Sequence, residues 1–139
     1  MNTHSLTALF NKNLAFTADI KGHTVRMDTT PDGGGDDTGP SPKRLMLAAL
    51  TGCTGMDIVS ILNKSKAPFS DFSVHVDAGI KETYPKIYDH VKITYRIKMA
   101  EADRRKMEKA VSLSQEKYCS VSAMFRAFAK IETEIIYLD

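Results

Sequence analysis

Two cysteines are the residues of this chain most able to do chemistry, and the first of them, Cys53, lies in a strongly apolar run. The glycines at positions 52 and 55 are poor helix formers, and they leave space beside the sulfur. Asp57 follows four residues later, on the same face of a helix. Its carboxylate would repel a thiolate, so we expect it to bond to a neighbouring group or to a partner chain.

The second cysteine, Cys119, stands at the predicted start of a helix, because Ser120 and Ser122 are typical of helix starts. Its sulfur would then meet unsatisfied backbone amides and the positive end of the helix dipole, which lower a thiol pKa. Lys117 adds positive charge nearby. Two such thiols indicate a redox pair. Each cysteine alone also fits a structural role, Cys53 as a small apolar core residue and Cys119 as a helix cap.

The histidines give no support to a metal site. His4, His23, His75 and His90 have no regular spacing from the cysteines, and two thiols alone do not complete a zinc site. We therefore expect no metal and no cofactor. His75 and His90 fall on the polar phase of their predicted strands, which indicates solvated side chains.

The composition is that of a soluble globular protein. The chain has 139 residues, 42% hydrophobic and 26% charged, which fits a single domain over 1–139 with a real core. A net charge of +2 with scattered lysines and arginines argues against nucleic acid or an anionic membrane as a partner. The N-terminus lacks the pattern of a secretory signal, so we expect a cytoplasmic protein.

Blocks of strands and helices predict an α+β fold with a largely antiparallel sheet. We expect strands at 14–20 and 25–27, a loop without regular structure at 29–40, a hairpin at 72–80 and 91–99, and a last strand at 131–138. Helices are expected at 102–117 and 119–129. Their predicted inward residues are Met107, Ala110, Val111 and Ser114 in the first, and Val121, Met124, Phe125 and Phe128 in the second.

The longest predicted element is a helix that begins at Ser41-Pro42 and runs to about Lys66, where Ala67-Pro68 ends it. It approaches membrane-spanning length, but Asp57 and several hydroxyl residues interrupt it, so a core or interface helix is the better interpretation. Its centre is apolar on nearly every side and must be covered all round. One small sheet covers one side only, and a partner subunit would cover the rest.

These features together resemble the OsmC/Ohr superfamily (osmotically inducible protein C and organic hydroperoxide resistance proteins), and most of all its YhfA-like branch. The resemblance rests on the stretch from Gly39 to Cys53, on Asp57, and on the distant Tyr118-Cys119-Ser-Val-Ser122. It spans about residues 14 to 137. It implies the OsmC-like fold, in which an antiparallel sheet packs on a long central helix, and an intertwined homodimer with active sites at the subunit interface.

The resemblance also implies a thiol peroxidase that reduces organic hydroperoxides. Cys53 matches the peroxidatic cysteine and Cys119 the resolving one, and a lipoyl-type or small dithiol would reduce their disulfide. An apolar pocket would suit the substrate, and we expect it to be lined by Leu47, Leu50, Met56 and Phe125.

Two positions depart from the family pattern. Lys43 stands where characterised peroxidases of the family have a glutamate, ten residues before the first cysteine. The arginine that holds the thiolate in the family has no clear match, and Arg26 is the best-placed candidate, ahead of Arg44. These departures leave two alternatives open: a non-catalytic dimer that binds a small apolar ligand, and a thiol redox sensor.

Overall fold

The computed structural model describes residues 2–139, which form two compact units. One unit ends at Met46 and the other comprises Leu47–Asp139. The single domain expected over 1–139 stays a prediction. The elements are α+β in composition, as predicted.

The first unit is built on a three-stranded antiparallel sheet of β1 (Thr7–Lys12), β2 (Ala15–Ile20) and β3 (His23–Met27), in that order. The hairpin of β2 and β3 was predicted, but β1 was not. Every residue of β1 is exposed within the chain. Because that strand buries no face here, its sequence lacks the alternation that marks a half-buried strand.

Residues 29–40 are ordered by Asp28, which corrects the expectation of a loop without regular structure. A short 3₁₀ turn spans Pro31–Gly33. The buried Asp28 carboxylate accepts bonds from the Thr29 amide, at 2.7 Å, and from the amide and hydroxyl of Thr38. A Cβ at Gly35 would lie 2.2 Å from the Thr29 carbonyl oxygen, so the loop has room only for glycine there.

The Asp28 contacts predict a loss of loop order in acid. The Thr38 hydroxyl and the Thr29 amide lower the pKa of Asp28 from 3.8 to about 2. A carboxyl whose pKa is lower in the folded state stabilises the fold at high pH, and this contribution disappears as pH falls from about 4 to about 2. We expect the hydrogen-exchange protection factors of the Thr29 and Thr38 amides to fall across that window. Asp28→Asn should remove this pH dependence of the protection factors. An equal fall in protection in that variant would contradict the prediction.

Helix α1 (Pro42–Lys64) begins and ends close to its predicted limits. The Ser41 hydroxyl accepts the Arg44 amide at 3.4 Å, as the predicted cap requires. Its fully buried side chains are spaced four residues apart and form one stripe: Leu50, Thr54, Ile58 and Leu62. Only one side of the helix is therefore covered within the chain.

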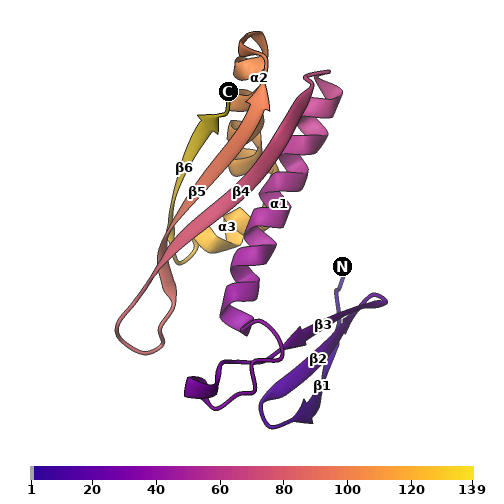
Figure 1. Cartoon of the computed structure of the whole chain (residues 1–139), viewed down its shortest axis with the longest axis vertical. Helices are drawn as coiled ribbons and strands as arrows, with labels where there is room; N and C mark the ends of the chain where they lie inside the picture. The colour runs from indigo at the N-terminus through magenta and orange to yellow at the C-terminus, as the bar shows by residue number, and fades with distance from the viewer. Residues whose placement is uncertain (1) are drawn as a thin grey trace. The chain divides into compact units, whose positions relative to one another are not determined.

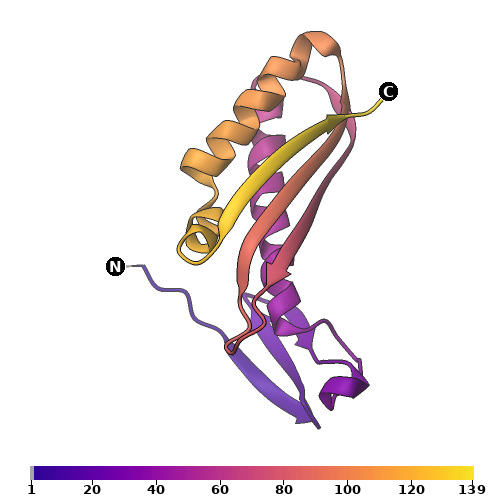
Figure 2. The same cartoon turned by 90° about the vertical axis from the view of Figure 1, so that its left-hand side faces the viewer.

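The second unit contains a three-stranded sheet in the order β4-β5-β6, with β4 (Phe69–Ile80), β5 (Tyr88–Met99) and β6 (Lys130–Tyr137). The hairpin of β4 and β5 is antiparallel, as predicted. Strand β6 runs parallel to β5, a direction that the expectation of a largely antiparallel sheet left open. The helices of this unit lie on one face of the sheet (Figures 1 and 2). The core forms between them and the alternate β5 residues Val91, Ile93, Tyr95 and Ile97.

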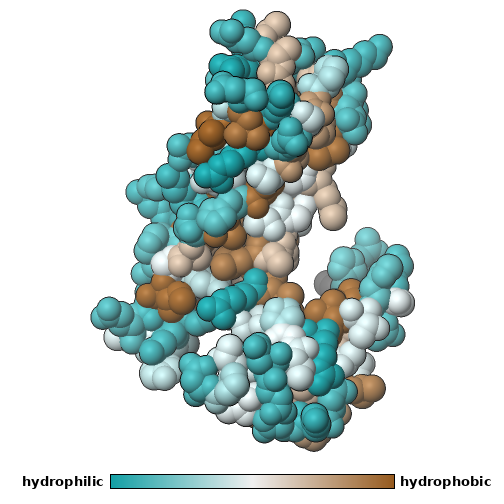
Figure 3. All heavy atoms as spheres, viewed as in Figure 1, coloured by the Kyte–Doolittle hydropathy of each residue, from teal (hydrophilic) through white to brown (hydrophobic). Residues whose placement is uncertain are grey.

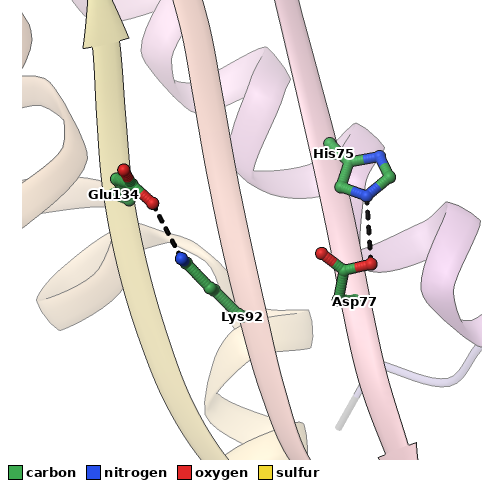
Figure 4. A network of polar contacts seen from close by, with 4 residues as sticks. All are labelled: His75, Asp77, Lys92 and Glu134. Carbon is green, nitrogen blue, oxygen red and sulfur yellow. Dashed lines mark hydrogen bonds and ion pairs between the residues drawn. The ribbon is translucent and has the colours of Figure 1, made fainter.

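The other face of this sheet is polar (Figure 4). Lys92 on β5 pairs with Glu134 on β6 at 2.8 Å, which raises the pKa of the lysine and lowers that of the glutamate. His75 lies 3.1 Å from Asp77 on β4. His75 and His90 are both exposed, as their strand phase predicted.

The chain returns from β5 to β6 through helices that differ in detail from the prediction. After a 3₁₀ turn at Glu101–Asp103, α2 (Arg104–Leu113) passes into a π-helical turn, η3 (Ser114–Tyr118), and then α3 (Ser120–Arg126) begins. All four predicted inward residues of 102–117 are buried: Met107, Ala110, Val111 and Ser114. In the second helix Phe125 is buried and Val121 is partly buried, but Met124 and Phe128 are 64% and 36% exposed, contrary to expectation. Ser122 faces the core in their place.

Large apolar side chains remain at the surface of both units (Figure 3). Leu9 and Phe10 are exposed in the first unit, and Met56, Tyr118 and Met124 in the second. Helix α1 is also long and apolar enough to cross a membrane by length and composition, a test that core helices of soluble proteins pass as well. One stripe of the helix packs in the core of the second unit.

Candidate active site

The two cysteines come together in the second unit. The Sγ atoms of Cys53 and Cys119 and a carboxylate oxygen of Asp57 all lie within 4.8 Å of one another. Both cysteines are free thiols. Helix α1 presents Cys53 and Asp57 on one face, as their spacing predicted, while Cys119 arrives from the start of α3. The fold thus brings together two thiols that lie 66 positions apart in the sequence.

The space beside Cys53 is only partly open. A Cβ built at Gly52 meets nothing within 4 Å, whereas one at Gly55 lies 3.4 Å from a methyl group of Val74. Gly52 thus leaves open space, as predicted, and Gly55 allows β4 to approach the helix. Cys53 itself is half-buried, and Cys119 is only 3% exposed.

Cys119 caps α3 as expected, but its acidity is the opposite of the prediction. Its sulfur accepts the Ser122 amide at 3.3 Å. Burial nevertheless raises the pKa of the Cys119 thiol, and the nearby Cys53 raises it further, against the lowering effect of the Ser122 bonds. Desolvation of the thiolate outweighs the helix-end effect because the sulfur is shielded from water. Cys119 is therefore a weaker nucleophile at neutral pH than its position at a helix start predicted.

A buried polar network, which the sequence did not predict as part of the site, lies beside the thiols. The Thr54 hydroxyl lies 2.8 Å from both the Tyr95 hydroxyl and the Ser114 hydroxyl. Ser114 donates to Asp57 Oδ2 at 2.9 Å. Ser114 has a single hydroxyl proton, so Thr54 must donate to Ser114, and Tyr95 must donate to Thr54. Burial raises the pKa of Tyr95, which keeps its proton available for that bond.

Gln115 ties this network to the start of α3. Its amide nitrogen lies 3.2–3.3 Å from the oxygens of Thr54, Tyr95 and Ser122. Arg126 donates to its carbonyl oxygen at 2.9 Å, which fixes the orientation of the amide. The π-helical turn η3 directs both Ser114 and Gln115 inward, and such turns are frequent at functional sites. The one signal in the sequence was the inward position predicted for the polar residue Ser114.

The predicted substrate-pocket residues occupy different environments. Leu50 and Phe125 are fully buried in the core, and Leu47 packs against it. Met56 is 75% exposed. An apolar substrate pocket made from these four side chains stays a prediction.

The charged candidates lie in the first unit, whereas the thiols belong to the second. Arg26, on β3, donates from Nε to Thr38 Oγ1 at 2.9 Å and from Nη1 to Asn11 Oδ1 at 3.0 Å. Lys43 and Arg44 are exposed in the first turn of α1, which contains no acidic residue. The role of any of these cations toward Cys53 stays a prediction.

Comparison with known proteins assigns the family. The model of the family described as OsmC-like protein matches residues 34–134. The chain belongs to the OsmC-like family. It is 33% identical to protein YhfA of Escherichia coli K12 over 110 residues, which cover 79% of each chain.

Solved structures show the same OsmC-like fold. A hypothetical protein from Aquifex aeolicus superposes with a TM-score of 0.84 at 24% identity over 100% of both chains. A Legionella pneumophila protein described as an organic hydroperoxide resistance protein superposes with a TM-score of 0.68 at 16% identity, over 98% of each chain. These matches confirm the predicted OsmC-like fold.

Proposed function

We propose that this OsmC-like protein is a thiol peroxidase that reduces organic hydroperoxides through a Cys53–Cys119 disulfide cycle. The observation that carries the proposal is the approach of the two sulfurs to within 4.8 Å of each other. A disulfide needs about 2.05 Å, so a modest local movement would close it. Structural neighbours described as organic hydroperoxide resistance proteins support the choice of substrate class.

The difference between the thiols supports their roles. Cys53 is half-buried and can meet a peroxide, whereas Cys119 is nearly inaccessible and its thiol pKa is raised by burial. The Cys53 thiolate attacks one peroxide oxygen and breaks the O–O bond. The alkoxide takes up a proton and leaves as an alcohol, and Cys53 becomes a sulfenic acid. Cys119 then attacks that sulfur, the S–O bond breaks, water leaves, and a disulfide forms. An external dithiol restores both thiols by exchange.

A homodimer is part of the proposal. Helix α1 buries a single stripe, and apolar side chains such as Met56 and Met124 remain exposed within one chain. Burying such residues against a second copy would cover the uncovered side of α1. We expect light scattering to give twice the 15.4 kDa chain mass. A monomer at micromolar concentration would contradict this part. The free thiols fit the reducing cytoplasm that we propose as its compartment.

The cycle predicts a specific oxidation product. Titration of the reduced protein with cumene hydroperoxide should remove both titratable thiols and give a peptide that links Cys53 to Cys119. Dithiothreitol or dihydrolipoamide should then support repeated turnover. Two thiols still titratable after excess peroxide would overturn the proposal.

A thiol redox sensor is the second candidate, because Lys43 replaces the glutamate that the family resemblance places before Cys53. The same titration separates the two functions. A sensor would form the internal disulfide once and would then show no sustained consumption of hydroperoxide with dithiol.

A further inference from the structure

Three side chains of types that can bind a metal lie close together in the second unit. Cys53 and Asp57 project from consecutive turns of α1, and Cys119 faces them from the cap of α3. Their two sulfurs and one carboxylate oxygen lie within 4.8 Å of one another. None of the three is fully exposed, so the group is not a solvated surface cluster. The third potential ligand beside the two thiols is a carboxylate and not one of the histidines.

These separations are close to those of a coordinated cation. Zinc bonds to cysteine sulfur at about 2.3 Å and to carboxylate oxygen at about 2.0–2.2 Å, so tetrahedral ligand atoms lie roughly 3.5–3.8 Å apart. A contraction of at most about 1.3 Å from the 4.8 Å limit would bring the three atoms to that geometry. We propose that Cys53, Asp57 and Cys119 form a three-ligand site for a thiophilic divalent cation of the Zn²⁺ or Cd²⁺ type, with the fourth position open.

The surroundings orient two of the ligands. Ser114, itself fully buried, donates to Asp57 Oδ2 and so orients the carboxylate beside the two sulfurs. The Ser122 amide holds the Cys119 sulfur. Such hydrogen bonds to ligating groups commonly tune metal affinity.

The ligand set also selects the cation. Two thiolates prefer a soft metal, whereas Mg²⁺ and Ca²⁺ require a shell of oxygen ligands. A bound cation would occupy both sulfurs, so metal binding and disulfide formation exclude each other. The site therefore offers reversible inhibition of thiol chemistry, but binding itself does not depend on peroxidase activity.

Cadmium titration of the reduced full-length protein tests the site directly. We expect one Cd²⁺ per chain, an ultraviolet thiolate-to-cadmium charge-transfer band, and displacement by Zn²⁺. Cys53→Ser and Cys119→Ser should each lose the band. Asp57→Asn should weaken binding by at least about tenfold, and Ser114→Ala by about tenfold. Asp77→Asn, which changes an exposed carboxylate on β4, is the matched control and should bind like the wild type.

X-ray absorption of the wild-type zinc complex keeps the test decisive even if a variant fails to fold. Two sulfur and one or two oxygen neighbours per zinc would support the site. Four sulfurs, or binding by Asp57→Asn at wild-type affinity, would overturn the three-ligand assignment. Absence of a charge-transfer band at micromolar Cd²⁺ would overturn the site altogether. Peroxide turnover is measured separately, so loss of either proposal leaves the other standing.

Discussion

Replacement of Cys53 by serine is expected to reduce hydroperoxide consumption to the uncatalysed rate. The chemical reason is that a thiolate is the nucleophile, and a serine hydroxyl has no comparable reactivity toward an O–O bond at neutral pH. The measurement is consumption of cumene hydroperoxide with excess dithiothreitol, under conditions in which the wild type turns over many times. Serine is close to cysteine in size, so the fold should persist, and equal melting temperatures would verify this.

Cys119→Ser is the matched comparison for this experiment. Because Cys119 is assigned to the resolving step, its loss should leave the first attack intact. One equivalent of hydroperoxide should be consumed rapidly, and a sulfenic acid at Cys53 should become trappable by dimedone. Unchanged turnover in Cys53→Ser would show that Cys53 is not the attacking thiol. If Cys119→Ser consumed no hydroperoxide at all, Cys119 would not be limited to the resolving step.

Replacement of Thr54 by valine is expected to destabilise the protein by about 1–3 kcal/mol, the usual cost of leaving a buried polar group without its partner. Valine keeps the shape of threonine but removes its hydroxyl. That hydroxyl accepts a hydrogen bond from Tyr95 and donates one to Ser114. The variant should also loosen Ser114, and with it Asp57, next to the thiols. Urea unfolding measures the first effect, and the rate of Cys53–Cys119 disulfide formation measures the second.

Thr51→Val provides the control on the same helix. The exposed Thr51 hydroxyl donates to the Ala48 carbonyl of its own helix at 2.9 Å, so its loss should cost no more than about 0.5 kcal/mol. Tyr95→Phe should cost about as much as Thr54→Val, and the double variant should cost less than their sum, because both remove the same bond. Equal losses of unfolding free energy in Thr51→Val and Thr54→Val would show that the buried network adds no stability beyond that of an exposed hydroxyl.

The sequence predicted well those elements whose signals are local. Ser41-Pro42 and Pro68 limit α1 correctly because capping and the absence of a proline amide act within one turn. The strict alternation in β4 and β5 predicted their hairpin because one face of each strand is buried against the helices.

The features that the sequence missed or misplaced arise where long-range packing decides. Strand β6 is parallel to β5 because α2 and α3 carry the chain back before it pairs, and no local signal encodes that direction. Met124 and Phe128 are exposed because α3 ends at Arg126 and turns Ser122 and Phe125 inward instead.

Within the candidate site, the sequence identified the two thiols that the structure brings together, but not their environment. Cys53 and Cys119 were singled out from residue type and position, and they do meet, whereas Asp57 was expected only to bond to a neighbour or a partner chain. The raised pKa of Cys119 was not predictable, because the helix end acts locally whereas burial depends on every element packed around the sulfur. The partners of Gln115 come from three other elements and likewise follow only from the fold.

The stripe that α1 buries contains three aliphatic residues and one hydroxyl, Thr54. Leucine and isoleucine tolerate small rotations of a helix about its axis, since dispersion contacts have little direction. A hydroxyl that must meet Tyr95 and Ser114 does not tolerate them, much as one polar residue fixes the register of a coiled coil. Cys53 immediately precedes Thr54 and lies about 100° away around the helix. The hydrogen bonds of Thr54 therefore also fix the direction in which the Cys53 side chain points. Apolar substitutions elsewhere along α1 can alter stability without changing that direction.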